Sequence, residues 1–153
     1  MKPSSRNTNK QLDGALRLAS ILLAILGAAD SLYLLILKYS SNDKMCLGNG
    51  DCSTVNQSSY SEIYGIPISL FGLLAYLVLL AILLLEPRVK IIRENSPLAV
   101  FGISLAGVGY SAYLTYIELY VIFAVCPFCV FSAVAMTLIF ILAIIRLVKQ
   151  TAS

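Results

Sequence analysis

The chain contains four cysteines, arranged as two pairs that differ in spacing and surroundings. The segment Cys126-Pro-Phe-Cys129 has the two-residue spacing that is typical of thiol–disulfide exchange. Pro127 suits the first position of a helix, because a proline lacks the N–H group that would be unsatisfied there. We therefore predict that both sulfurs lie at the amino end of a helix, where the helix dipole and the unpaired backbone N–H groups stabilise a thiolate.

The other pair, Cys46 and Cys52, encloses five residues that include two glycines and an Asn-Gly step. Such a segment can turn sharply and move. Its disulfide could therefore meet a soluble thiol protein and then Cys126, each step being the attack of a thiolate on a sulfur.

Two other interpretations of the cysteines remain open. A structural disulfide that pins the loop explains Cys46 and Cys52, but not the second pair, whose ring is too short to constrain much of the unfolded chain. A zinc site could use all four thiolates, although the gap between Cys46 and Cys52 is wider than in the usual structural zinc pattern. We predict catalytic thiols and no bound metal.

The elements that must hold these cysteines appear as four stretches nearly free of charge, in a chain that is 59% hydrophobic and 12% charged. Each stretch is long enough, at roughly 1.5 Å per residue, to cross a hydrocarbon core about 30 Å thick. Backbone polar groups must be satisfied internally there, which favours helices. We predict an all-α membrane protein, a four-transmembrane-helix bundle with helices at 18–37, 66–85, 98–117 and 127–145. The predicted domain, 18–147, lies between a cytoplasmic segment, 1–17, and a cytoplasmic tail, 148–153.

Basic residues predict the orientation of this bundle. Nine of the eleven lysines and arginines fall on one side of the four crossings, whereas the other side carries only Lys38 and Lys44. The positive-inside rule then places both termini in the cytoplasm. The outward segments, about 38–65 and 120–126, hold or adjoin all four cysteines, on the side where disulfides form and persist. We predict a multi-pass protein of the cytoplasmic membrane whose cysteines face the periplasm or the extracellular side.

Electrons from the thiols need an acceptor that the membrane can supply. The sequence has no histidine, which is the commonest haem and metal ligand, and it has no glycine-rich nucleotide fingerprint after a strand. Cys129 should lie about one turn into the last helix, at the boundary of the hydrocarbon. A lipid-soluble two-electron acceptor could reach it there, and a quinone of the ubiquinone, menaquinone or phylloquinone type meets that requirement.

These features resemble the vitamin K epoxide reductase family in its bacterial form. The family has a loop cysteine pair after helix one, a Ser or Thr shortly after it, and a two-spaced pair that opens the last helix. This chain matches with Cys46, Cys52, Ser58 and the 126–129 dithiol, and also with the segment Gly-Ile-Pro-Ile-Ser-Leu-Phe-Gly at 65–72. The resemblance implies that electrons pass from a secreted thioredoxin-fold thiol oxidase to the loop pair, then to Cys126, Cys129 and a quinone.

The resemblance also implies a quinone site at Ser58, Cys129 and Ala133. Ala133 stands four residues after the last cysteine, where vertebrate members have a tyrosine, so binding of vitamin K epoxide or of anticoagulants does not carry over. Many bacterial members carry a fused thioredoxin-like domain, whereas this chain ends at Ser153. We therefore expect the thiol donor to be a separate polypeptide. A quinone or epoxide reductase working in the reductive direction, and a non-enzymatic thiol metal carrier, remain as alternatives.

Two acidic residues lie inside the predicted helices, where an ionisable group is costly. For Asp30, in helix one, we expect an internal hydrogen bond, for example to Tyr110 or Tyr113. Glu118, near the outer end of helix three, could relay protons released by the thiols. The alternative, which we favour from the sequence, is that its side chain reaches the membrane surface.

Overall fold

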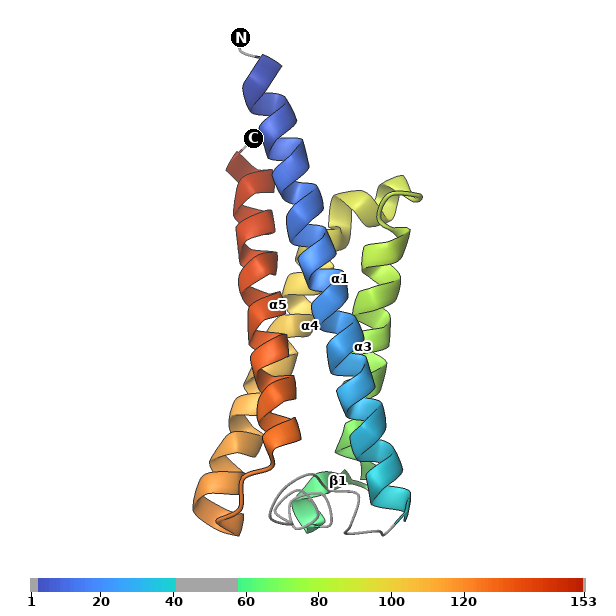
Figure 1. The fold of residues 1–153 in the computed structure, drawn as a ribbon, viewed down its shortest axis with the longest axis vertical. Coiled ribbons are helices and arrows are strands. Elements are labelled where there is room, and N and C mark those ends of the chain that lie inside the picture. Colours follow the sequence, from blue (N-terminus) through green and yellow to red (C-terminus); the bar gives the residue numbers. More distant parts are fainter. Residues whose placement is uncertain (1–2, 41–57, 153) are drawn as a thin grey trace.

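Helices make up most of the computed structural model, which describes residues 3–40 and 58–152 (Figure 1). The four long helices are α1 (Pro3–Ser40), α3 (Ile68–Leu85), α4 (Lys90–Ile117) and α5 (Pro127–Ala152). All four are long and apolar enough to cross a membrane. The predicted all-α, four-helix membrane fold is confirmed.

Five helix ends differ from the apolar runs, and two of them are carboxyl ends: α1 continues to Ser40 and α5 to Ala152. α1 begins at Pro3, so the predicted amino-terminal segment is a continuous part of this helix. α4 begins at Lys90, eight residues before its apolar run. α3 begins at Ile68, because the two preceding residues form a short strand and the backbone of Pro67 is extended. Hydropathy marks the part of a helix that suits lipid, whereas these helix ends depend on polar residues outside that part.

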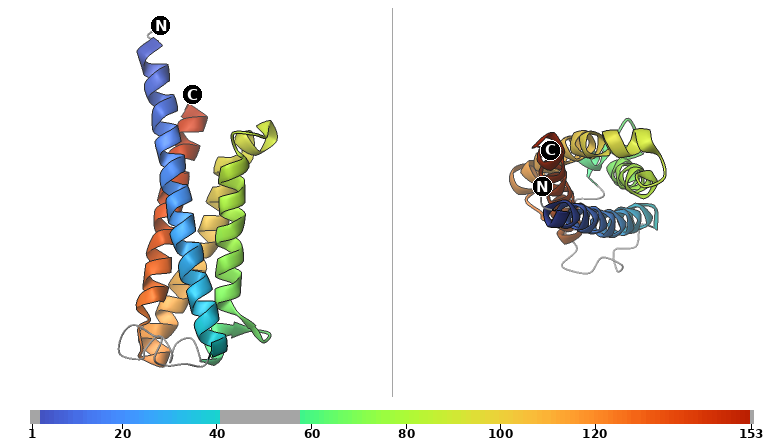
Figure 2. Two further views of the ribbon diagram at one scale, coloured as in Figure 1. Left: turned by 45° about the vertical axis from the view of Figure 1, so that its right-hand side comes forward. Right: turned by 90° about the horizontal axis from the view of Figure 1, so that it is seen from above.

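The four helices form a closed ring rather than a row. α1 packs against α3 and α5, and α4 packs against the same two neighbours on the other side. Seen along its long axis, the bundle shows the helices around a common centre (Figure 2). Both termini lie at one end of the bundle, and the start of α5 lies at the other (Figure 1).

The core of the bundle depends on close approaches at two glycines. A Cβ atom on Gly27 would lie only 2.2 Å from the ring of Tyr76, and one on Gly107 would lie 2.8 Å from Met136. The absent side chains therefore let α1 approach α3, and α4 approach α5. The buried core around them comprises Ala24, Tyr76, Leu79, Leu83, Val100, Met136, Ile139 and Ala143.

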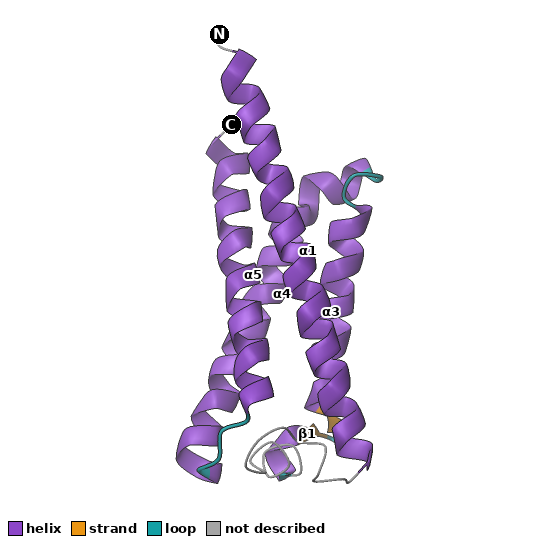
Figure 3. Cartoon of the chain, viewed as in Figure 1, coloured by secondary structure: helices purple, strands orange, loops and turns teal. Residues whose placement is uncertain are grey.

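Short irregular elements close the end of the bundle opposite the termini (Figure 3). A 3-10 turn, η2 (Ser59–Ser61), leads into two antiparallel strands, β1 (Glu62–Ile63) and β2 (Ile66–Pro67). Tyr64 and Gly65 join the strands, both with positive φ, 53° and 80°. This is the backbone sign pattern of a tight two-residue hairpin turn. A π-helical turn, η3 (Glu118–Ile122), extends α4 toward α5.

Candidate active site

Cys126 directly precedes α5 and Cys129 lies in its first turn, as the spacing predicted. Pro127 is the first residue of α5. The carbonyl of Cys126 accepts a hydrogen bond from the backbone N–H of Val130 at 3.1 Å, so Cys126 stands at the N-cap position. Cys126 is fully buried and Cys129 is half-buried. The helix dipole therefore acts on both sulfurs in the sense that favours a thiolate.

Aromatic and aliphatic side chains fix this helix start against α1. Cys126 is buried in a small cluster with Leu34, Leu37 and Ala124. Phe128, between the two cysteines, packs its ring on Tyr33 of α1, with the ring centroids 4.9 Å apart. The dithiol is thus held on a packed part of the bundle, which favours a constant position of the two sulfurs.

The chain reaches Cys126 through a strained reversal after α4. The π-helical turn ends at Ile122, and the next residue, Phe123, has a φ of 57° in the left-handed region. That conformation costs a non-glycine residue roughly 1–3 kcal/mol and occurs mainly where the surrounding structure enforces it. The carbonyl of Glu118 accepts a hydrogen bond from the N–H of Ala124 at 3.1 Å, which stabilises the reversal. Isolated π-turns of this kind are frequent at functional sites.

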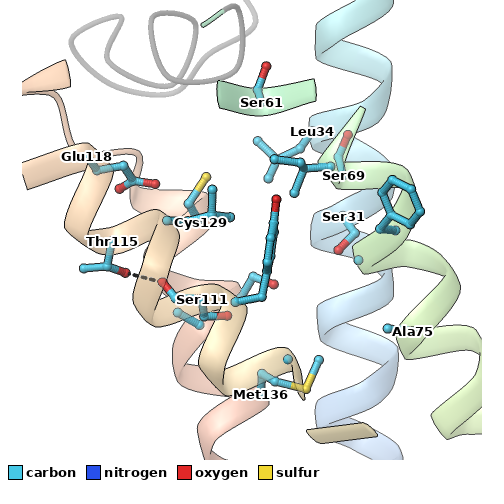
Figure 4. A pocket seen from close by; sticks show the side chains of 18 of the residues that line it. Ser31, Leu34, Ser61, Ser69, Ala75, Ser111, Thr115, Glu118, Cys129 and Met136 are labelled. Carbon is cyan, nitrogen blue, oxygen red and sulfur yellow. Dashed lines mark hydrogen bonds between the residues drawn. The ribbon is translucent and has the colours of Figure 1, made fainter. Parts of the chain in front are cut away.

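The side chain of Glu118 contacts both cysteines. Its carboxylate lies near enough to the backbone N–H of Cys126 and to the thiol of Cys129 to interact with both, and the residue is only 4% exposed. Figure 4 shows this carboxylate beside the Cys129 sulfur. The expectation that Glu118 reaches the membrane surface is wrong, because the π-turn directs its side chain inward. Its second interpretation, as a proton acceptor for the thiols, remains a prediction.

Cys129 also lines a cavity of about 400 Å³ inside the same end of the bundle. This volume falls in the range of about 300–1,000 Å³ that is typical of small-molecule sites. Ser58 and Ala133, which the sequence predicts to contact a quinone, line the cavity together with Cys129. Other lining residues come from all four helices and include Ser31, Leu34, Ser69, Ala75, Tyr76, Ile103, Leu114, Glu118 and Met136.

The cavity is mainly apolar, and two polar groups stand out in its wall. The hydroxyl of Tyr76 donates a hydrogen bond to the carbonyl of Ser132 at 2.8 Å, which links α3 to α5. The Oγ atom of Ser69 is buried and has no hydrogen-bond partner within the described part of the chain. Sequence reasoning missed Ser69 as a site residue, although it lies within the 65–72 segment that carries the family resemblance.

A short polar segment holds Ser58 at the cavity. The carbonyl of Ser58 accepts hydrogen bonds from the backbone N–H of Ser61 at 3.0 Å and from its hydroxyl at 2.7 Å. Lys38, at the end of α1, donates to the hydroxyl of Ser61 at 2.7 Å and pairs with Glu62 at 3.0 Å. The β1–β2 hairpin and α1 thus position this part of the cavity wall.

The other residues that the sequence singled out are the loop cysteines and Asp30. Cys46 and Cys52 lie outside the described residues. Asp30 is 7% exposed and its Oδ2 atom has no partner in the described ranges. The expected hydrogen bond to Tyr110 or Tyr113 is not formed, because these two rings lie against each other instead, with centroids 6.0 Å apart.

We compared the chain with known protein families and with curated proteins. The model of the vitamin K epoxide reductase family matches residues 18–144, which include α3, α4 and the dithiol. The thiol-disulfide oxidoreductase LTO1 of Arabidopsis thaliana is 36% identical over 93 residues. These residues make up 58% of this chain and 25% of LTO1, so the match spans about a quarter of that protein.

Proposed function

Because this chain belongs to the vitamin K epoxide reductase family, we propose that it is a quinone-dependent thiol oxidoreductase that promotes disulfide bond formation. Its electrons come from a thioredoxin-fold dithiol protein on the outer side of the cell membrane. The similarity to a thiol-disulfide oxidoreductase supports the thiol chemistry. The observation that carries the proposal is the placement of Cys129, which lies between the Glu118 carboxylate and an apolar cavity in the membrane-spanning bundle.

The cavity suits a quinone ring by its chemistry. Apolar side chains surround it, and Ser69 supplies a buried hydroxyl that could donate to a quinone carbonyl. Ser58, which also lines the cavity, could contribute a second hydroxyl, as the family resemblance implies. A bound quinone would accept two electrons and two protons per turnover. The residues of the chain bind and orient it, exclude water and accept the proton of the Cys129 thiol.

Electron transfer within the protein proceeds by exchange of disulfides. The donor dithiol reduces the Cys46–Cys52 disulfide and becomes a disulfide itself. A thiolate of the loop pair then attacks the sulfur of Cys126 in an oxidised Cys126–Cys129 pair, which releases Cys129. The second loop cysteine resolves this mixed disulfide, so that the loop pair is oxidised again and the helix pair carries two thiols. Two electrons and two protons have then moved from donor to helix pair.

Partner-driven quinone reduction tests donor, acceptor and direction together. The purified full chain in detergent receives a reduced thioredoxin-fold protein and a quinone, and both quinone consumption and partner oxidation are followed. We expect equal amounts of quinol and partner disulfide. Cys126→Ala and Cys129→Ala should reduce the rate to that of the reaction without protein, because no thiolate then reaches the acceptor.

A matched pair of variants tests whether the acceptor uses the cavity. Ala133→Phe should fill the cavity and raise the KM for quinone at least about ten-fold, an effect of about 1.4 kcal/mol. Val134→Phe adds the same ring one residue away, at a side chain that is 53% exposed on the outer face, and should leave the KM unchanged. Equal effects of the two variants would contradict a quinone site in this cavity. Stoichiometric soft-metal binding without quinone turnover would favour the carrier function instead.

A further inference from the structure

A second cavity lies at the end of the bundle that holds the termini, far from the dithiol. Its volume is about 480 Å³, and α1, α4, α5 and the end of α3 all contribute to its wall. Four basic side chains and two acidic ones line it, so its charge is positive overall. These residues are Lys10, Asp13, Glu86, Arg93, Arg146 and Lys149.

The two carboxylates of this cavity are already engaged. Arg146, only 4% exposed, donates from Nε to Asp13 at 3.1 Å and from Nη2 to Glu86. The other oxygen of Glu86 accepts a hydrogen bond from Ser96 at 3.0 Å and lies 3.9 Å from Nε of Arg17. The acidic groups therefore compensate Arg146 and Arg17 and leave the other basic groups of the cavity uncompensated.

Two cationic donors remain buried without a partner. Nη1 of Arg146 and Nζ of Lys149 are inaccessible to solvent and find no acceptor within the part of the chain that the structure describes. A buried charged donor without an acceptor is costly, more so than a neutral group in the same position. The two residues are three apart on α5 and therefore share one face of the helix. Both side chains line the cavity, so a small rotation of each would bring its donor to a single ligand there.

We propose that this cavity binds a phosphate group. Phosphate oxygens are strong acceptors, and a guanidinium with a neighbouring ammonium is a typical phosphate-binding set. Lys10 and Arg93 add positive charge from α1 and α4. The cavity lies where the membrane-spanning helices leave the hydrocarbon, and basic pockets between helices at that level bind lipid headgroups. The phosphate is carried by an anionic phospholipid or is free in solution, and these two sources can be separated by experiment.

The test is a binding titration of the purified full chain in neutral detergent. Its readout is the melting temperature at each ligand concentration. Dioctanoyl phosphatidylglycerol, phosphate-free dioctanoylglycerol and sodium phosphate at constant ionic strength are titrated separately. We expect a saturable rise in melting temperature with the phosphate-bearing ligand and none with dioctanoylglycerol. A rise with phosphatidylglycerol alone identifies a lipid headgroup, and an equal rise with sodium phosphate identifies the free ion.

Three variants assign the effect to the cavity. Lys149→Gln and Arg93→Gln should each weaken the apparent affinity about five-fold, because each removes one charge near the phosphate. Lys90→Gln, an exposed lysine at the same end but outside the cavity, should bind as the unmodified chain does. Arg93 is exposed, so its replacement reports on binding even if Lys149→Gln unfolds. The proposal fails if phosphatidylglycerol and sodium phosphate both stabilise no more than dioctanoylglycerol, or if all three variants bind equally.

Discussion

One carboxylate in the candidate site, that of Glu118, lies beside both the backbone N–H of Cys126 and the thiol of Cys129. Disulfide exchange and quinone reduction both require a thiolate, so the proton of Cys129 must leave before the sulfur reacts. Glu118 lies beside that thiol and is shielded from water. This placement is the one expected of a general base, and the hydrogen bond from Ala124 to the Glu118 carbonyl holds the turn that carries the carboxylate close to the dithiol.

Replacing Glu118 with glutamine should therefore impair catalysis more than folding. Glu118→Gln keeps the shape of the side chain and an oxygen that can accept from the N–H of Cys126, but it removes the group that accepts a proton. We expect kcat for quinone reduction to fall about 100-fold, in the range that general base catalysis contributes, while the KM for quinone changes little. Steady-state kinetics with saturating thiol donor measures both constants.

Glu94→Gln is the matched control, since Glu94 lies on the same helix at the opposite end of the bundle and is exposed. It should behave as the unmodified chain. If Glu118→Gln retained kcat within two-fold, the carboxylate would only position the helix start. A fall in melting temperature without a change in kcat would lead to the same conclusion.

The dithiol could be predicted from the sequence, whereas its carboxylate contact could not. The helix start at Pro127 follows from local spacing and from the chemistry of proline. The inward direction of Glu118 depends on a π-turn and on the left-handed Phe123, and no glycine marks that conformation in the sequence. The sequence contains one sign of this contact, since the carboxylate of Glu118 stands only eight positions before Cys126.

The position of the cavity depends on a close approach between two helices, which is possible because one of them has a glycine at the point of contact. Tyr76 of α3 lies over Gly27 of α1, and its hydroxyl reaches across to the carbonyl of Ser132 on α5. A single tyrosine therefore joins three helices at the wall of the cavity. The spacing of α1 and α3 depends on the missing Cβ at position 27.

Gly27→Ala should destabilise the bundle even though alanine is the better helix former. The gain in helix propensity is about 1 kcal/mol. The new methyl group would overlap the Tyr76 ring, and overpacking of a tight core costs about 1–3 kcal/mol, occasionally more. We expect a net loss of stability, measured as a lower midpoint of thermal unfolding in detergent.

Gly14→Ala gives the control on the same helix, because a Cβ there meets nothing within 4 Å. It should leave the midpoint unchanged or raise it slightly. If both variants raised the midpoint equally, the close approach of α1 and α3 would not limit stability.

The number and approximate position of the helices follow from hydropathy, but their neighbours in the ring do not. The apolar segments carry hydrophobic residues on all faces, since lipid covers the outside, so periodicity does not identify the inner face. The part of α1 just before its apolar run is held by tertiary contacts at Asp13 and Arg17. Arg17 donates to the carbonyl of Leu83 at 2.8 Å, and Asp13 pairs with Arg146. None of these pairings is visible in the local sequence.

The two ends of the molecule differ in chemistry. One end holds the dithiol, the hairpin and the cavity proposed for quinone. The other holds both termini, the Arg146 ion pairs and the cavity proposed for phosphate (Figure 1). Basic residues concentrate at this second end, and such residues are typical of the cytoplasmic side. The proposed oxidase activity requires this orientation, because cytoplasmic thiols are kept reduced.

Cysteine labelling in intact cells tests the orientation. The native cysteines are first replaced by alanine, and one new cysteine is then placed at an exposed turn of either end. Tyr64, fully exposed in the hairpin, and Lys90, exposed at the start of α4, are suitable positions. With a membrane-impermeant maleimide, Tyr64→Cys should be labelled in intact cells. Lys90→Cys should be labelled only after the membrane is disrupted.

The reversed labelling pattern would place the dithiol on the reducing side of the membrane. Thioredoxin and glutathione would then hold Cys126 and Cys129 as thiols, and net disulfide formation for secreted proteins could not occur. The same cavity and dithiol would in that case favour the reductive direction, with a quinone or its epoxide as the oxidant. Orientation therefore decides the direction of electron flow, even though the residues that carry the electrons are the same in both cases.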